Sequence, residues 1–335
     1  MTEAPLVPGW PLAHREWQGG RRYQEDDSGA LEVEAVEPGD PPALLMVLAD
    51  GMGGEAGGAI ASDTVVRTFI RQFESSTGSI GTRLRECLAQ ATASLAEQEQ
   101  NDPRLAGMGS TVVAALYDGR RLSWLSVGDS PMWLFADGRL ERLNEDHSMM
   151  PVLESLVRDG EMTREEALGD RRRNMLRSAV TGVPASLVDR AERSCRLRPG
   201  DYLLIASDGL ETLSEEEIEA CLVRAGGGAE NAASALLATV ERVAGPNQDN
   251  VTFLLLSGDS AAGDRAAHRT DPVGAAGEPE AAARSGRRLA SFAAVLMVGL
   301  LAGIAAGTLD ADWLAPSNPG DRQVAECESR FPRTA

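Results

Sequence analysis

Positive charge is scarce in this sequence. Its 335 residues hold 32 Lys and Arg against 51 Asp and Glu, which gives a formal net charge of −19. Proteins that bind nucleic acid neutralise phosphates with Lys and Arg, so this imbalance argues against a nucleic-acid-binding protein. We expect most of the acidity to form a solvated surface that keeps the protein soluble.

Cysteine is also rare. The four cysteines lie far apart and form no Cys-x-x-Cys pair, which argues against a zinc site and a disulfide framework. We expect Cys87, Cys195 and Cys221 to be small core residues in a reducing compartment, whereas Cys327 lies in the C-terminal tail. Residues 1–16 lack the apolar run of a signal peptide and are predicted to form a flexible leader.

One long apolar run is present near the C-terminus. Residues 289–309 carry no charged side chain over 21 positions, and a helix of that length would span about 31 Å, close to the thickness of the bilayer core. This run predicts a single transmembrane helix in the cell membrane. Arginines precede it and aspartates follow it, so residues 17–257 are expected in the cytoplasm and 310–335 outside the membrane. The polar, Ala- and Gly-rich residues 258–288 predict a disordered linker.

Three glycines lie four residues apart within the predicted span, at Gly299, Gly303 and Gly307. Small residues on one helix face allow close helix pairing, which predicts a homodimer. The general abundance of glycine in membrane helices explains the same spacing, and both interpretations stay open.

Residues 17–257 alternate apolar, β-branched runs with two pairs of helical patterns. The predicted strands are 29–36, 43–50, 110–118, 121–129, 131–135, 201–207 and 250–256, and the predicted helices are 57–74, 82–100, 214–224 and 229–244. Turn signals join several consecutive strands, which favours antiparallel pairing. We therefore predict an α+β fold, a four-layer α/β/β/α sandwich of two antiparallel sheets flanked by helical pairs. The polar residues 144–180 are expected to form an irregular insertion that could act as a flap.

Acidic clusters occur where predicted strands end. Three of the four adjoin strongly apolar runs, and a carboxylate at the end of a buried strand is costly unless a cation meets it. Several converging carboxylates typically bind a hard divalent cation such as Mg²⁺ or Mn²⁺. The pattern therefore predicts a binuclear metal site suited to hydrolysis of a phosphate ester. The clusters are Glu25 with Asp26, Asp50 with Gly51, Asp208 with Gly209, and Asp249 with Asn250.

Seven short motifs follow one another in a specific order. They are RRYQED, DGMGG, GST, VGDS, DHS, SDG and QDN, spread over residues 17–257. The series resembles the metal-dependent Ser/Thr protein phosphatases (PPM, protein phosphatase type 2C) in their bacterial form. The resemblance implies hydrolysis of phosphoserine and phosphothreonine on proteins by a metal-activated water. It implies phosphorylated protein partners, either a Ser/Thr kinase or the targets of such a kinase. The alternative is a weak or inactive relative that acts as a binding or scaffold module.

The resemblance also implies roles for individual residues. Asp50 would bridge two Mn²⁺ or Mg²⁺ ions, with Gly51 adding its backbone carbonyl. The remaining ligands would be Asp208 and Asp249 for one ion, Glu25 and Asp26 for the other, and Asp129 together with Asp208 for a third, weaker ion. Arg21 would bind the substrate phosphate through its planar guanidinium, and Asn250 would orient the ligands from behind.

The sequence departs from the family pattern at four places, Gln24, Met52, Pro131 and Thr181-Gly182, and two of them bear on the chemistry. Met52 stands where eukaryotic members have a histidine, which leaves the general acid open. Pro131 follows VGDS where the family usually has arginine, so a contact of that arginine is expected to be lost. His147 in the DHS motif is expected to form a structural turn rather than to act in catalysis.

Overall fold

The computed structural model describes residues 7–34, 41–53 and 57–258. The chain divides into two units, Met1–Val273 and Gly274–Ala335, of which the second lies wholly outside the described residues. The predicted span 289–309, its glycines and the tail 310–335 therefore lie outside them too, as does almost all of the predicted linker. Within the described ranges, none of the helices is both long and apolar enough to cross a membrane.

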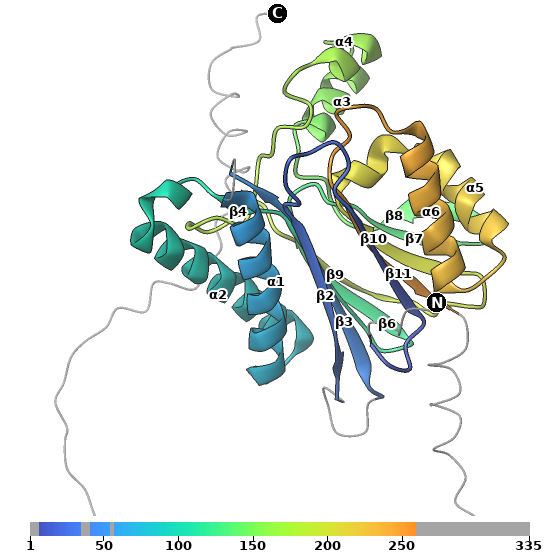
Figure 1. Ribbon diagram of the computed structural model, residues 1–335, viewed down its shortest axis with the longest axis horizontal. Helices are drawn as coiled ribbons and strands as arrows, with labels where there is room; N and C mark the ends of the chain where they lie inside the picture. The colour runs from blue at the N-terminus through green and yellow to red at the C-terminus, as the bar shows by residue number, and fades with distance from the viewer. Residues whose placement is uncertain (1–6, 35–40, 54–56, 259–335) are drawn as a thin grey trace, which may run out of the picture. The chain divides into compact units, whose positions relative to one another are not determined.

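Two antiparallel sheets form the centre of the described unit (Figure 1). The first contains, in spatial order, β1 (Leu12–Trp17), β11 (Val251–Ser257), β10 (Tyr202–Ala206), β7 (Met132–Ala136) and β8 (Arg139–Arg142). The second contains β2 (Asp26–Val33), β3 (Ala43–Met52), β5 (Val112–Tyr117), β6 (Arg121–Val127) and β9 (Asp189–Ser194), with the short β4 (Gly109–Ser110) paired to the end of β3.

A helical pair covers the outer face of each sheet, as Figure 1 shows. Helices α1 (Gly57–Ser75) and α2 (Ile80–Asn101) pack on the β2–β3–β5–β6 sheet, while α5 (Glu215–Ala225) and α6 (Ala229–Val243) pack on the other. Successive side chains of a strand point to opposite faces of its sheet. One face of each sheet therefore meets its helices, and the other face meets the opposite sheet. The predicted four-layer sandwich is confirmed.

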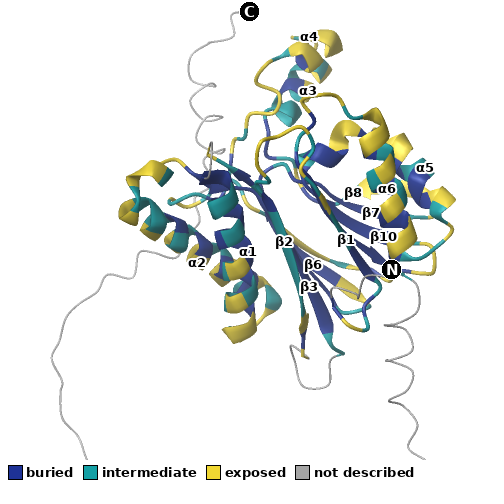
Figure 2. Ribbon diagram, in the orientation of Figure 1, coloured by how far each residue is buried: buried dark blue, intermediate teal, exposed yellow. Residues whose placement is uncertain are grey.

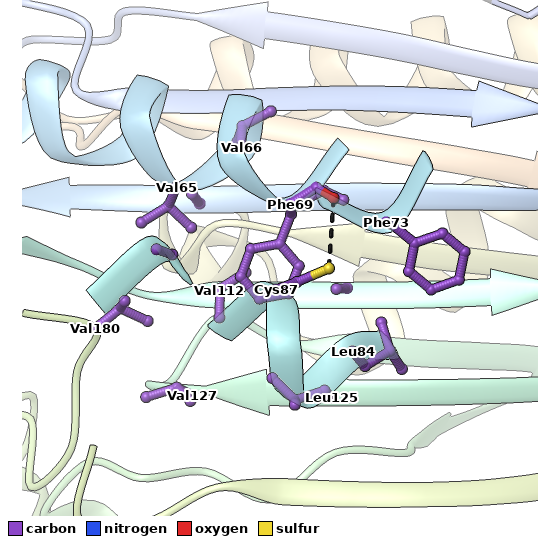
Figure 3. Packing of buried hydrophobic residues seen from close by; sticks show 14 of the residues in the cluster. Val65, Val66, Phe69, Phe73, Leu84, Cys87, Val112, Leu125, Val127 and Val180 are labelled. Carbon is purple, nitrogen blue, oxygen red and sulfur yellow. Dashed lines mark hydrogen bonds between the residues drawn. The ribbon is translucent and has the colours of Figure 1, made fainter. Parts of the chain in front are cut away.

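Three apolar clusters fill the spaces between the layers, and the buried residues follow the strands and inner helix faces in Figure 2. Figure 3 shows the cluster under α1 and α2, where Phe69 and Phe73 lie beside Leu84 and Cys87. The Cys87 thiol donates to the carbonyl of Phe69 at 3.5 Å. Cys195 and Cys221 are likewise buried and unbridged, as the sequence predicted.

The N-terminal segment differs from its prediction. A leader was expected over residues 1–16, yet residues 12–16 belong to β1, and Trp10 and Val7 pack into the core between the sheets. The prediction is wrong for these residues because LAHREW alternates poorly and its strand character comes from pairing with β11. Strands β8 and β9 were missed for the same reason, since both are short, Arg-rich edge strands.

The segment between β8 and β9 contains two short helices, α3 (Met150–Arg158) and α4 (Arg164–Gly169), but none of the strands named above. It projects from one end of the sheets in Figure 1. One isolated bridge, Ser148 with Leu176, pairs two parts of this segment, and a second, Ser110 with Val180, ties it to the body. Because Ser110 also pairs with Gly51, the insertion adjoins the end of β3 that carries Asp50.

Candidate functional site

The site begins where β2 and β3 pair. Asp26 and Asp50 are directly opposite in the ladder, which places their Cβ atoms about 4.5–5.5 Å apart. One residue further on, the Gly51 N–H donates to the carbonyl of Glu25 at 3.0 Å. The predicted residues of two separate motifs therefore meet at one end of a single strand pair.

The other sheet reaches this pair through Ser207, the residue after β10. Its hydroxyl donates to Oδ2 of Asp26 at 2.7 Å, and its N–H donates to the carbonyl of Thr252 at 2.9 Å. The next residue, Asp208, lies near enough to Asp50 for its charge to raise the pKa of the Asp50 carboxyl. Carboxylates from both sheets are thus held together across the centre of the sandwich.

Asn250 fixes the loop that precedes β2. Its Oδ1 accepts from the Glu25 N–H at 2.9 Å, while its Nδ2 donates to the carbonyls of Gln18 and Tyr23 at 2.8 and 3.0 Å. The side chain is buried, so these bonds also satisfy every polar atom of its amide. This is the geometry that the predicted orienting role requires.

Arg21 lies on the same loop and forms an ion pair with Asp249. Its side chain is 51% exposed, so the guanidinium remains accessible at the edge of the carboxylate group. Its charge also lowers the pKa of Glu25 and of Asp208, in each case against a larger raising effect of burial. Arg21 is therefore positioned to meet an anion that approaches the carboxylates.

Asp129 occupies a turn between β6 and β7 that His147 holds from behind. The Gly128 N–H donates to Nδ1 of His147 at 3.2 Å, and the His147 N–H donates to the Gly128 carbonyl at 3.1 Å. Burial lowers the pKa of His147, which keeps the ring neutral and able to accept. The structural role that was expected for His147 agrees with this arrangement.

The carboxylates of the site repel one another. Burial, together with neighbouring carboxylates, raises the pKa of Asp26 to about 7, of Asp129 to about 7 and of Asp208 to about 6. The pKa of Asp50 is raised well above its usual range by burial and then by Asp26 and the other aspartates. A cation placed among these groups would remove both penalties.

The sequence profile of the protein phosphatase 2C family matches residues 33–226, more than half of the chain. The chain belongs to the protein phosphatase 2C family. It is 32% identical over 202 residues to the serine/threonine protein phosphatase PstP of Mycobacterium tuberculosis, covering 59% of this chain and 38% of PstP. The chain thus matches well under half of PstP's length. It is 29% identical over 244 residues to the phosphatase stp of Listeria monocytogenes, covering 71% of this chain and 92% of that protein.

Solved structures of the family share this fold. The crystal structure of M. tuberculosis PstP/Ppp has 30% identity and a TM-score of 0.61, covering 73% of this chain and 97% of that one. Stp1 of Staphylococcus aureus has 26% identity and a TM-score of 0.64, covering 77% and 98%. The catalytic domain of PstP in complex with two manganese ions has 30% identity and a TM-score of 0.59, covering 73% and 96%. Dependence on Mn²⁺ or Mg²⁺ is general in this family.

The residues of this chain fit such ions. The donors are carboxylate and carbonyl oxygens, which hard divalent cations prefer. Oε1 of Glu25 is buried and has no hydrogen-bond partner in the described part of the chain. A Cβ on Gly58 would lie 2.4 Å from that atom, and a Cβ on Gly51 would lie 2.1 Å from the Gly58 carbonyl. Glycine at both positions therefore keeps the space around Glu25 free of side chains.

The ligand set is not drawn together into a closed cluster. Across residues 7–34, 41–53 and 57–258, no group of three or more His, Cys, Asp or Glu side chains is already arranged to hold an ion. Asp249 is engaged by Arg21, and the aspartates repel one another. The metal-ligand roles of Glu25, Asp26, Asp50, Gly51, Asp129, Asp208 and Asp249 stay predictions.

Sequence reasoning missed the hydroxyls that support the carboxylates. The Asp50 N–H donates to Oγ1 of Thr111 at 2.9 Å, and Thr111 shares a 2.7 Å hydrogen bond with Ser130. Ser207 supports Asp26, as described above. The only signal was their presence in the GST, VGDS and SDG motifs, because a lone Ser or Thr has no pattern that distinguishes it.

Proposed function

We propose that this protein hydrolyses phosphoserine and phosphothreonine on other proteins and needs Mn²⁺ or Mg²⁺ to do so. The observation that supports this proposal most directly is the convergence of Asp26, Asp50 and Asp208 from two sheets, with the exposed Arg21 at their edge. The relatives named serine/threonine phosphatases give the reaction class.

Each residue contributes by binding or by orientation. Arg21 binds the phosphate oxygens through a planar, two-pronged guanidinium. Asp50, opposite Asp26 and close to Asp208, lies at the centre of the ligand set, and the carbonyl of Gly51 adjoins it. Divalent ions at this site would lower the pKa of a water molecule and neutralise charge that builds on the phosphoryl group. The proposal includes two ions in the core and a third, weaker one at Asp129 and Asp208.

We also propose that the chain is anchored in the cell membrane by residues 289–309, with the phosphatase unit in the cytoplasm. The support is the uncharged 21-residue run, with arginines before it and aspartates after it. A partner Ser/Thr kinase, and a homodimer through Gly299, Gly303 and Gly307, belong to the same proposal. Membrane fractionation of cells that express the full chain, compared with a variant lacking 289–309, tests the anchor.

The test of activity uses the purified protein with Mn²⁺, a phosphoserine peptide and a phosphothreonine peptide, and measures released phosphate. We expect turnover that chelation with EDTA abolishes and added Mn²⁺ restores. Binding of Mn²⁺ without turnover of either peptide or of an aryl phosphate would instead support the scaffold alternative. Failure to bind Mn²⁺ at all would refute the metal site.

A further inference from the structure

Arg142 at the end of β8 lies between two segments that carry site carboxylates. Its Nη2 donates to the backbone carbonyl of Asp129 at 2.6 Å, and its Nη1 donates to Oε1 of Glu211 at 3.2 Å. Glu211 is part of the short helix η2 (Asp208–Thr212), which begins with Asp208. One guanidinium therefore joins the turn of Asp129 to the turn of Asp208.

Other residues hold this turn from its two sides. His147 binds Gly128 before it, and Asn144 accepts from the Met132 N–H and donates to the Ser130 carbonyl after it. Among the described residues, Arg142 supplies the hydrogen bond to the Asp129 carbonyl itself. It is also the contact that reaches across to η2.

The charges around Arg142 show why a cation is needed there. Burial has the largest effect on Asp129 and raises its pKa. Asp208 and Asp146 raise the pKa of Asp129 further, because each of them repels its carboxylate. Arg142 lies 3.2 Å from Glu211 and 4.0 Å from Asp146, and its side chain is only 23% exposed. Its charge is therefore weakly screened by water and opposes the repulsion that would separate the two turns.

The sequence also shows why a positive charge near this turn comes from Arg142. Pro131 stands where the family usually has arginine, and a proline side chain carries no donor or charge. Arg142 approaches the same turn from the next strand along the chain, since β7 and β8 pair antiparallel with Trp133 opposite Arg142. Arg142 thus supplies positive charge at this turn, where Pro131 supplies none.

We infer that Arg142 is a positioning residue that fixes Asp129 relative to Asp208 and thereby sets the affinity for the weaker ion at these two carboxylates. The inference rests on the proposed metal-dependent function. It concerns a residue that touches neither substrate nor ion. Its effect should appear in the dependence on metal concentration rather than in turnover at saturating metal.

The experiment is a calorimetric Mn²⁺ titration of the full chain, paired with phosphatase assays over the same Mn²⁺ range. For Arg142→Ala we expect the weakest binding step, and the Mn²⁺ concentration for half-maximal turnover, to shift by about 10-fold or more, as for other groups that orient metal ligands. The tighter steps should stay within about twofold. Arg142→Lys keeps the charge but cannot bind both partners as a fork, so we expect an intermediate shift.

Arg193→Ala is the matched control. Arg193 pairs at 3.1 Å with Glu141, the neighbour of Arg142, but its side chain is 38% exposed and contacts neither turn. We expect its titration to match that of the unmodified protein. The positioning role of Arg142 would be overturned if the weakest Mn²⁺-binding step were unchanged in Arg142→Ala. It would also be overturned if Arg142→Lys bound Mn²⁺ as the unmodified protein does. Equal weakening of all steps, with a lower melting temperature, would show a merely structural role.

The calorimetric result separates this inference from the proposed function. If the unmodified protein binds Mn²⁺ but hydrolyses no phosphopeptide, the proposed function fails while the shift in Arg142→Ala can still be measured. If the protein is active and the weak step does not move, only the role of Arg142 fails.

Discussion

At the residue scale, Asp50 is the least replaceable side chain of the site. It lies opposite Asp26, is close to Asp208, and has its N–H held by Thr111. Its place at the end of a buried strand could be predicted from the DGMGG motif, because an Asp-Gly at the end of an apolar run is visible in sequence. The supporting hydroxyls of Thr111 and Ser207 could not be predicted, since their partners lie on other strands.

Asp50→Asn should lower turnover by roughly 10³-fold, because it weakens the hold on the cations that would neutralise charge on the phosphoryl group. Without added metal, the same change should raise the melting temperature, since it removes a buried charge surrounded by other carboxylates. Phosphopeptide assays and calorimetric melting in EDTA measure the two effects. Turnover equal to that of the unmodified protein would refute the central role of Asp50.

At the scale of elements, the site depends on how closely β10 and β11 approach. A Cβ on Gly209, just after β10, would lie 1.8 Å from the carbonyl of Asn250, just before β11. The chain therefore needs glycine there to bring Asp208 and Asp249 to the same edge. Sequence showed the Asp-Gly pair as a turn, but only the pairing of the strands shows what the glycine faces.

Gly209→Ala should destabilise the protein by about 1–3 kcal/mol, as for other overpacked sites, and should weaken Mn²⁺ binding as the two loops separate. Gly245→Ala is a suitable control, because a Cβ there meets nothing within 4 Å. Urea unfolding and Mn²⁺ titration of both variants give the comparison. Equal stability for the two would contradict the close approach.

The helical pairs were the part of the fold that the sequence predicted best. Apolar residues at helical spacing placed α1 and α2, and Ser214 with Glu217 forms a capping box at the start of α5. Phe69 lies fully buried between α1, α2 and the sheet, as Figure 3 shows. These local patterns succeed because each helix buries one continuous stripe.

Phe69→Ala should cost about 3–5 kcal/mol of unfolding free energy, the range for deleting a fully buried aromatic side chain. Arg71→Ala on the outer face of the same helix should change it by less than about 0.5 kcal/mol. Chemical denaturation of each variant measures the change in the free energy of unfolding. A loss below about 1 kcal/mol for Phe69→Ala would mean that the helix does not pack as described.

At the scale of the whole molecule, acidity and the metal site are coupled. The sequence contains no lysine, so all 32 basic residues are arginines, against 51 acidic ones. Arg21 and Arg142 form ion pairs at the edge of the site, with Asp249 and with Glu211. We expect bound cations to neutralise the remaining negative charge at the site. The stability of the fold should therefore depend on both pH and metal concentration.

Without metal, the protein should lose stability as the pH rises from 6 to 8. Burial raises the pKa of both Asp26 and Asp129 in the folded state to about 7, well above the usual range of an aspartate, so the folded state holds more protons than the unfolded state in this window. Their neutral forms stabilise the fold at pH 6, and that contribution, on the order of a few kcal/mol, declines through pH 7. Burial lowers the pKa of His147, which favours its neutral form.

Melting temperatures in EDTA and in Mn²⁺ at pH 6, 7 and 8 provide the measurement. We expect a decline with pH in EDTA that Mn²⁺ removes, and a smaller decline for Asp26→Asn. A melting temperature in EDTA that rises with pH would show that the carboxylates are not strained in the folded state.

The sequence by itself determined the order of the acidic motifs, the helical pairs and most of the central strands, because each depends on neighbours within a few residues. Tertiary structure decided what no local pattern could carry. It made residues 12–16 an edge strand through pairing with β11, joined Asp26 to Ser207 across two sheets, and brought Arg142 to the turn of Asp129. These contacts join residues far apart in the chain or on different strands, so their energies appear only once the layers have packed.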